Sequence, residues 1–228
     1  MKELSSLEQL VGIKFNNRDL LQQAFVHRSH INEHPEFTMP HNERLEFLGD
    51  AVLELIVTDY LYLNHKNPEG ELTSWRAALV NSKMLARIGE GLNFNDYLLL
   101  SRGEAQDKGR ARHFIIADAV EAFIGSIYLD QGFESAKQFI DTYILSHFNE
   151  VMEKKLYQDP KSIFQEHAQE RKSITPRYEV LKETGPDHDK HFRVGVYLES
   201  ELIAEGEGAS KQDAQEDAAR NAMEKKGW

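Results

Sequence analysis

Apolar residues recur at helical spacing along the first two thirds of the chain, and the pattern then changes. From Leu4 to about His147, one amphipathic stretch follows another, whereas the alternation of apolar and polar residues that marks a strand is nearly absent. Short breaks rich in Gly, Asn or Pro separate these stretches, at 16–17, 67–70, 91–93 and Gly132. This pattern predicts an all-α domain over residues 1–150.

The rest of the chain follows a different pattern. The segment 149–160 lacks a large apolar face and ends in Asp159-Pro160, so we expect a linker over residues 151–158. Residues 159–228 predict a short amphipathic helix, three strands and a closing helix that starts after Ser210, a good N-cap. The expected bounds of these elements are about 160–170, 177–183, 191–200, 201–208 and about 211–225. The order α-β-β-β-α predicts an α+β domain and makes the chain a multi-domain protein.

Acidic residues interrupt the apolar pattern in the segment 41–55, which reads HNERLEFLGDAVLEL. Its leucines, phenylalanine and valine recur at helical spacing, as on a helix packed into a core. Four acids nevertheless fall at i, i+3, i+7 and i+11 on one common stripe: Glu43, Glu46, Asp50 and Glu54. Like charges one turn apart repel by roughly 0.2–0.5 kcal/mol per pair on an exposed helix, and more where water is excluded.

A second acidic pair lies in a segment that is otherwise apolar. Asp118 and Glu121 are the only charged residues between Phe114 and Leu129, and their i, i+3 spacing puts them on one helix face. An uncompensated buried carboxylate costs several kcal/mol, so each acid needs a partner or a proton. That partner could be an Arg or Lys in a structural ion pair, or a metal ion.

Two acid pairs on facing helices can bring four carboxylates to one small volume, as in the metal sites of helix bundles. Oxygen ligands without cysteine suit a hard ion such as Mg²⁺. Four negative charges balance two divalent ions, and two ions about 3.5–4 Å apart would hold the attacking and leaving oxygens of a phosphodiester displacement. The spacing therefore favours a metal-dependent phosphodiesterase.

Composition narrows the possible classes of protein. The 228 residues include no cysteine, which excludes disulfides and thiolate metal sites and favours a reducing, cytoplasmic location. No apolar run approaches the roughly 18 residues of a membrane-spanning helix, so we expect no membrane partner. Residues 1–158 hold 16 basic and 23 acidic residues, and residues 159–228 hold 11 and 15. Neither part is basic, so any contact with a nucleic acid would have to come from local patches.

The segment 41–53, HNERLEFLGDAVL, resembles the signature of the ribonuclease III family nearly residue for residue. Further blocks resemble the same family in the same order, namely PEGELT at 68–73, RAALV at 76–80, SRGE at 101–104 and IADAVEA at 116–122. The resemblance implies that Glu46, Asp50, Asp118 and Glu121 are the metal-binding catalytic carboxylates. It also implies that Glu43 and Glu69 are supporting acids beside that cluster.

For the reaction, the resemblance implies hydrolysis of double-stranded RNA by water activated by Mg²⁺, with Mn²⁺ as a substitute and no small-molecule cofactor. The expected products carry 5′-phosphate and 3′-hydroxyl ends with short 3′ overhangs, cut by a homodimer in which each subunit cleaves one strand. Ribosomal RNA precursors and structured messages are the implied substrates. We expect Gly49 to permit close helix approach, Arg44 to pair with nearby acids, Glu54 to be solvated or ion-paired, and His41 to cap the helix or face solvent.

The C-terminal part resembles a double-stranded RNA-binding domain, in KSIFQE at 161–166, GPDH at 185–188 and Ser210-Lys211. Such domains read the shape of about 16 base pairs through sugar hydroxyls and phosphates. The implied RNA contacts are Gln165, Gln169, His188, Ser210 and Lys211. The family usually has a lysine cluster at the start of the last helix, and here Lys211 is followed by Gln212, Asp213 and Gln215. We expect weaker and less salt-sensitive duplex binding than in a lysine-rich homologue.

Two other functions fit part of this pattern. A non-catalytic double-stranded RNA-binding or ribosome-associated factor would keep the fold but should lack at least one metal-binding acid, and none is missing. A metal hydrolase of small phosphate esters would fit the acid-rich helical domain alone. The appended RNA-binding module argues against that second alternative.

Overall fold

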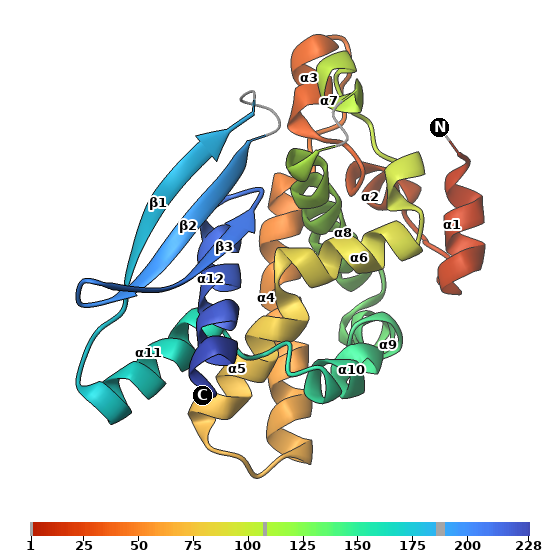
Figure 1. Ribbon diagram of the computed structural model, residues 1–228. Helices are drawn as coiled ribbons and strands as arrows, with labels where there is room; N and C mark the ends of the chain where they lie inside the picture. Colours follow the sequence, from red (N-terminus) through yellow and green to blue (C-terminus); the bar gives the residue numbers. More distant parts are fainter. Residues whose placement is uncertain (1, 107–108, 186–189) are drawn as a thin grey trace. The chain divides into compact units, whose positions relative to one another are not determined.

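The computed structural model describes residues 2–106, 109–185 and 190–228 (Figure 1). It divides into two compact units, Met1–Tyr157 and Gln158–Trp228. The helices of the first unit are α1 (Leu4–Val11), α2 (Arg18–Gln23), α3 (Arg28–Glu33), α4 (Glu43–Asn64), α5 (Glu69–Val80), α6 (Ser82–Gly91), η1 (Phe94–Asp96), α7 (Arg102–Gln106), α8 (Arg110–Gln131), α9 (Phe133–Tyr143), η2 (Leu145–His147) and α10 (Phe148–Glu153). The expected helical domain is confirmed.

The core of the first unit is built around α4 and α8, two helices of 22 residues that pack along each other. Phe123 of α8 lies at its centre, fully buried, with its ring 5.3 Å from that of Phe94 and 5.2 Å from that of Phe139. The predicted breaks coincide with helix ends. Asn17 caps α2 by accepting a hydrogen bond from the backbone N–H of Asp19, and Gly132 separates α8 from α9 at φ 82°.

The first unit extends further along the chain than its expected boundary at residue 150. Phe148 and Val151 of α10 are buried, three residues apart on one helix face, and Met152 and Tyr157 pack against the same core. The ring of Phe148 lies 5.8 Å from that of Trp75. Most of the expected linker therefore belongs to the first unit, because two apolar residues per turn are enough to anchor a short helix.

The second unit has the expected order α-β-β-β-α, in elements α11 (Pro160–Lys172), β1 (Arg177–Thr184), β2 (His191–Leu198), β3 (Glu201–Gly208) and α12 (Lys211–Lys226). The strands form an antiparallel sheet in the order β1-β2-β3. β2 ends at Leu198 rather than at residue 200, because Glu199 has a positive φ of 54° and turns the chain into β3. Ser210 caps α12 as expected, accepting from the backbone N–H of Asp213 at 3.1 Å.

Both helices of the second unit pack on a common core. Phe164 and Ala168 of α11 are fully buried beside alanines of α12 and apolar residues of β2 and β3. α12 lies directly on β3, since a Cβ on Gly206 would overlap the backbone of Ala218. This packing leaves the polar side of α11 in solvent. In the parts of the chain that the structure describes, no helix is both long and apolar enough to span a membrane.

Candidate active site

Two glycines bring the backbones of α4 and α8 into direct contact. A Cβ added to Gly49 would overlap the carbonyl oxygen of Glu121, and one added to Gly125 would overlap the carbonyl oxygen of Leu45. Gly49 lies three residues after Glu46, so the point of closest approach is also where the two acidic segments meet. The expectation that Gly49 permits close helix approach is confirmed.

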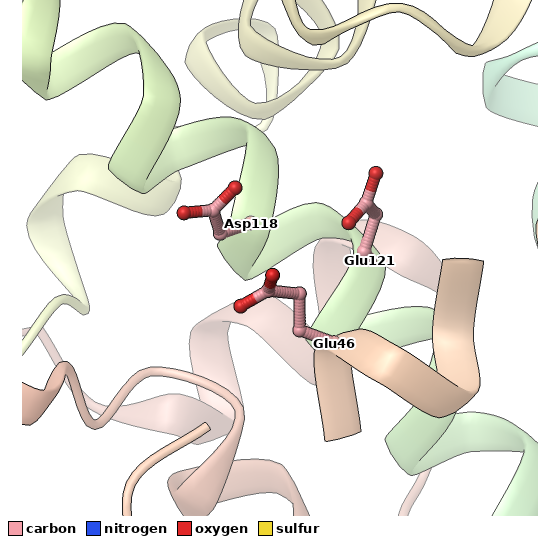
Figure 2. A group of neighbouring side chains, drawn as sticks. All are labelled: Glu46, Asp118 and Glu121. Atoms are coloured by element: carbon pink, nitrogen blue, oxygen red, sulfur yellow. The ribbon is translucent and has the colours of Figure 1, made fainter. Parts of the chain in front are cut away.

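Three of the four expected carboxylates converge at this crossing (Figure 2). One carboxylate oxygen from each of Glu46, Asp118 and Glu121 lies within 4.8 Å of the other two, and all three side chains are partly buried. Figure 2 shows Glu46 extending from α4 toward Asp118 and Glu121 on α8. We call these three residues the carboxylate cluster.

Asp50 lies at the edge of the carboxylate cluster. It follows Glu46 by one turn of α4, is exposed, and is outside the group whose oxygens lie within 4.8 Å. Of the neighbouring acids, Asp50 nevertheless raises the pKa of Glu121 the most through its charge. The structure therefore brings three of the four expected ligands together, whereas Asp50 lies next to them with its side chain exposed to solvent.

Burial and mutual repulsion make these carboxylates hard to ionise. Burial, followed by the charges of Asp50, Asp118 and Glu46, raises the pKa of Glu121 to about 8. Burial, followed by the charges of Asp118, Glu43 and Asp50, raises the pKa of Glu46 to about 6. Burial and the charge of Glu43 also raise the pKa of Asp118. A cation placed among these oxygens would remove the repulsion.

No Lys or Arg of the described residues supplies that cation. Within residues 2–106, 109–185 and 190–228, neither Lys nor Arg forms an ion pair with Glu46, Asp118 or Glu121, so a structural ion pair does not explain their position. The available donors are carboxylate oxygens, which divalent hard ions prefer. Partly buried acids without a basic partner thus fit a divalent metal ion.

The acid Glu43 lies beside the cluster as expected. It is exposed in the first turn of α4, 3.4 Å from Nη1 of Arg28, and its charge acts on both Glu46 and Asp118. His41 is partly buried at the start of α4, with Nδ1 3.8 Å from the Glu43 carboxylate, so it does not simply face solvent. Arg44 is exposed and, among the described residues, has no ion pair; the expected pairing with acids is not seen.

Two other acids of the expected set lie away from the cluster. Glu69 begins α5 and accepts a hydrogen bond from Oγ1 of Thr73 at 3.1 Å. It follows the far end of α4, and the helix from Glu46 to Asn64 spans about 27 Å. The expectation that Glu69 lies beside the cluster is therefore wrong within one chain. Glu54 is partly exposed, and the described chain contains no ion pair to it.

The expected RNA contacts of the second unit are surface groups where the structure describes them. Gln165 and Gln169 are exposed on the same side of α11, and Ser210 and Lys211 start α12. The Lys211 ammonium lies 5.8 Å from the centre of the Phe192 ring. His188 lies outside the described residues.

Sequence reasoning missed an apolar stripe on the solvent side of α4. Phe47, Leu55 and Tyr62 are 80%, 58% and 73% exposed, at i, i+8 and i+15 on the helix. We call these three residues the α4 stripe. The signal was present in the sequence, because α4 has more large apolar residues than a single buried face can hold.

Residues 17–148 match the family model described as Ribonuclease-III-like, and residues 160–226 match the double-stranded RNA binding motif. The chain belongs to the ribonuclease III family. A Ribonuclease 3 from Oceanobacillus iheyensis is 42% identical over 228 residues, covering 97% of each chain. A Ribonuclease 3 from Streptococcus pneumoniae is 43% identical over 227 residues, covering 99% of this chain and 97% of the relative.

A solved structure supports the fold of the helical unit. The nuclease domain of ribonuclease III from Campylobacter jejuni, described for flexibility in a region involved in dimer formation, aligns with a TM-score of 0.58 and 42% identity. The alignment covers 64% of this chain and 99% of that domain. This member of the ribonuclease III family is thus an endoribonuclease that carries a double-stranded RNA-binding domain, as the sequence resemblance implied.

Proposed function

We propose that Glu46, Asp50, Asp118 and Glu121 hold Mg²⁺ and form the catalytic site for hydrolysis of double-stranded RNA. The observation that supports this proposal is the carboxylate cluster, with oxygens of three acids within 4.8 Å of one another. Asp50, on the exposed side of the cluster, would complete the ligand set as substrate arrives. Mn²⁺ has the same charge and also accepts oxygen ligands, so the same donors suit it.

The chain's own contribution is to hold these acids in place. When bound, the metal would supply activation of a water molecule and charge stabilisation of the leaving 3′ oxygen. The glycine crossing holds the Glu46 and Glu121 carboxylates close together before substrate binds, which limits reorganisation during the reaction. With its pKa raised to about 8, Glu121 would hold a proton near neutral pH without a metal and would have to release that proton to serve as a ligand. Attack of water on phosphorus with departure of the 3′ oxygen would leave 5′-phosphate and 3′-hydroxyl ends, and it requires no protein nucleophile.

Metal removal tests this function directly. Incubated with a long perfect RNA duplex, the native protein is expected to cut it in Mg²⁺ or Mn²⁺ and to leave it intact in EDTA, because the carboxylates alone cannot activate water. Electrophoresis gives the rate, and labelling of the ends identifies the 5′-phosphate and the 3′ overhang. Duplex binding without cutting would instead support the non-catalytic RNA-binding factor. Hydrolysis of a small aryl phosphate without duplex cleavage would support the phosphate-ester hydrolase.

We further propose that two copies of the chain pair through the α4 stripe, so that each copy cuts one strand. Exposed aromatic and leucine side chains of this kind favour burial in an interface. The stripe runs along the same helix that carries Glu46. Two copies related by a two-fold axis across α4 would bring Glu69 of one copy toward the carboxylate cluster of the other. Such an arrangement accounts for an acid that is remote from the cluster within its own chain.

The substitution Phe47→Asp tests the dimer. A carboxylate at the most exposed position of the α4 stripe is expected to weaken dimerisation by about 30-fold or more, as for a central aromatic residue of an interface. Sedimentation velocity over a concentration series measures the shift from dimer to monomer. Leu10→Asp is the matched control, because Leu10 is 49% exposed on α1, outside the stripe. A Phe47→Asp variant that sediments like the native protein would contradict the proposed interface.

A further inference from the structure

The start of α12 has a cation that the sequence pattern does not reveal. Lys211 is followed by Gln212, Asp213 and Gln215, where a lysine-rich segment would carry more positive charge. In the structure, the Nζ of Lys161 donates a hydrogen bond to Oε1 of Gln215 at 2.6 Å. Lys161 belongs to α11, 54 residues earlier. A positive charge therefore lies at the second turn of α12 without a lysine in that turn.

The position of Lys161 is set by the packing of its helix. Its backbone N–H donates to the Asp159 side chain, which caps α11, and the buried Phe164 anchors the helix against α12. Its ammonium also lies 5.4 Å from the centre of the Tyr178 ring. Gln215 and Tyr178 thus hold the Lys161 side chain from two sides, which reduces the rotamer entropy that a contact with a ligand would remove.

Lys161 also lies on the side of α11 that carries the expected RNA contacts. Lys161, Gln165 and Gln169 follow at i, i+4 and i+8, which places them on one side of the helix. The Lys161 side chain therefore reaches from this side of α11 to the second turn of α12. A duplex that touches both Gln165 and Lys211 would pass close to it.

Among the described residues, the charge of Lys161 is not neutralised by an acid. Several other cations of this unit are, with Lys190 2.8 Å from Glu183, Arg193 2.5 Å from Glu205, and Lys226 3.4 Å from Glu201. In this part of the chain, the Lys161 ammonium contacts the neutral amide of Gln215 and the ring of Tyr178, neither of which carries a negative charge. An ammonium has three donors, so this bond leaves two for an anion.

We propose that Lys161, positioned by Gln215, contacts a phosphate of the bound RNA duplex. This inference rests on the proposed function and deepens it, because it adds a binding residue to the RNA surface. It also changes the expectation from the sequence. Lys161 of α11 supplies a positive charge that the residues of α12 lack. The affinity for duplex RNA and its salt dependence should therefore exceed those expected from the α12 residues alone.

A salt titration of the full-length protein tests Lys161. With a perfect duplex in EDTA, which prevents cutting, Lys161→Gln is expected to reduce the slope of log affinity against log salt by about 0.7–0.9, the value for one phosphate. Lys225→Gln is the matched control, since Lys225 lies in the last turn of α12 and should leave the slope unchanged. Thermal melting of each variant checks folding, and a purely structural role for Lys161 would shift melting without changing the slope.

The exchange Lys161→Gln with Gln215→Lys gives a second, independent test. It places a lysine on α12 and its amide partner on α11, and is expected to restore the native slope and affinity. A native slope in the single variant, or failure of the folded exchange variant to recover it, would overturn the role of Lys161. Absence of any duplex binding by the native protein would instead overturn the proposed function itself, so the two failures are distinguishable.

Discussion

Replacing Glu121 with Gln is expected to abolish duplex cleavage in Mg²⁺, by roughly 10²–10³-fold or more, while duplex binding in EDTA stays at the native level. The pKa of Glu121 is raised to about 8, because burial and three acidic neighbours oppose its ionisation. Gln keeps the size of the side chain and removes the charge that a divalent ion needs. Binding uses a different unit of the chain and should be unaffected.

Initial rates of duplex cleavage, measured at several Mg²⁺ concentrations, provide the comparison. Glu153→Gln makes the same chemical change at an exposed position of α10, away from the cluster, and should cut at the native rate. A Glu121→Gln variant that retains cleavage within tenfold of the native rate would remove Glu121 from the proposed ligand set.

Loss of folding is not expected to explain the loss of cleavage. The folded-state pKa of Glu121 lies above its ordinary value of 4.5, so its protonated form favours folding. That contribution is complete below pH 4.5 and is lost as the pH rises through about 8. In EDTA at pH 8 or above, Glu121→Gln should therefore melt at or above the native temperature. Added Mg²⁺ should raise the melting temperature of the native protein more than that of the variant.

Replacing Gly49 with Ala is expected to damage both stability and cleavage. The new methyl group would overlap the carbonyl oxygen of Glu121, in a place where both neighbours are helix backbone and cannot rotate away. Overpacking of this kind costs typically about 1–3 kcal/mol. The helices must separate, which also moves Glu46 away from the Glu121 carboxylate, and a displacement of about 1 Å can cost 10²-fold in rate.

Thermal melting and the rate of duplex cleavage measure the two effects of Gly49→Ala. The matched control is Gly70→Ala, because Gly70 lies in a helix and has no atom within 4 Å of an added Cβ. In the control, alanine should be neutral or stabilise α5 by up to about 1 kcal/mol. If Gly49→Ala melts and cuts like the native protein, the close crossing of α4 and α8 does not position the carboxylates.

Much of the fold follows from local sequence patterns. The helical period, the breaks at Asn17 and Gly132, and the cap at Ser210 each depend on residues within a few positions of one another, so the expected elements agree with those observed. The position of α10 depends instead on residues far away in the sequence. The ring of its buried Phe148 packs against that of Trp75, which is more than seventy positions earlier in the chain.

The sequence by itself determined the candidate acids and their spacing, since Glu46, Asp118 and Glu121 stand out wherever a helical period can be read. Their convergence was decided only by the tertiary structure, because it depends on Gly49 meeting the backbone of α8 at one point. The same is true of the separation of Glu69 from the cluster. It is true also of the hydrogen bond from Lys161 to Gln215, because it joins α11 and α12, which are separated in the sequence by all three strands. Local periodicity places a side chain on a face of its own helix, whereas packing between distant segments decides what that face meets.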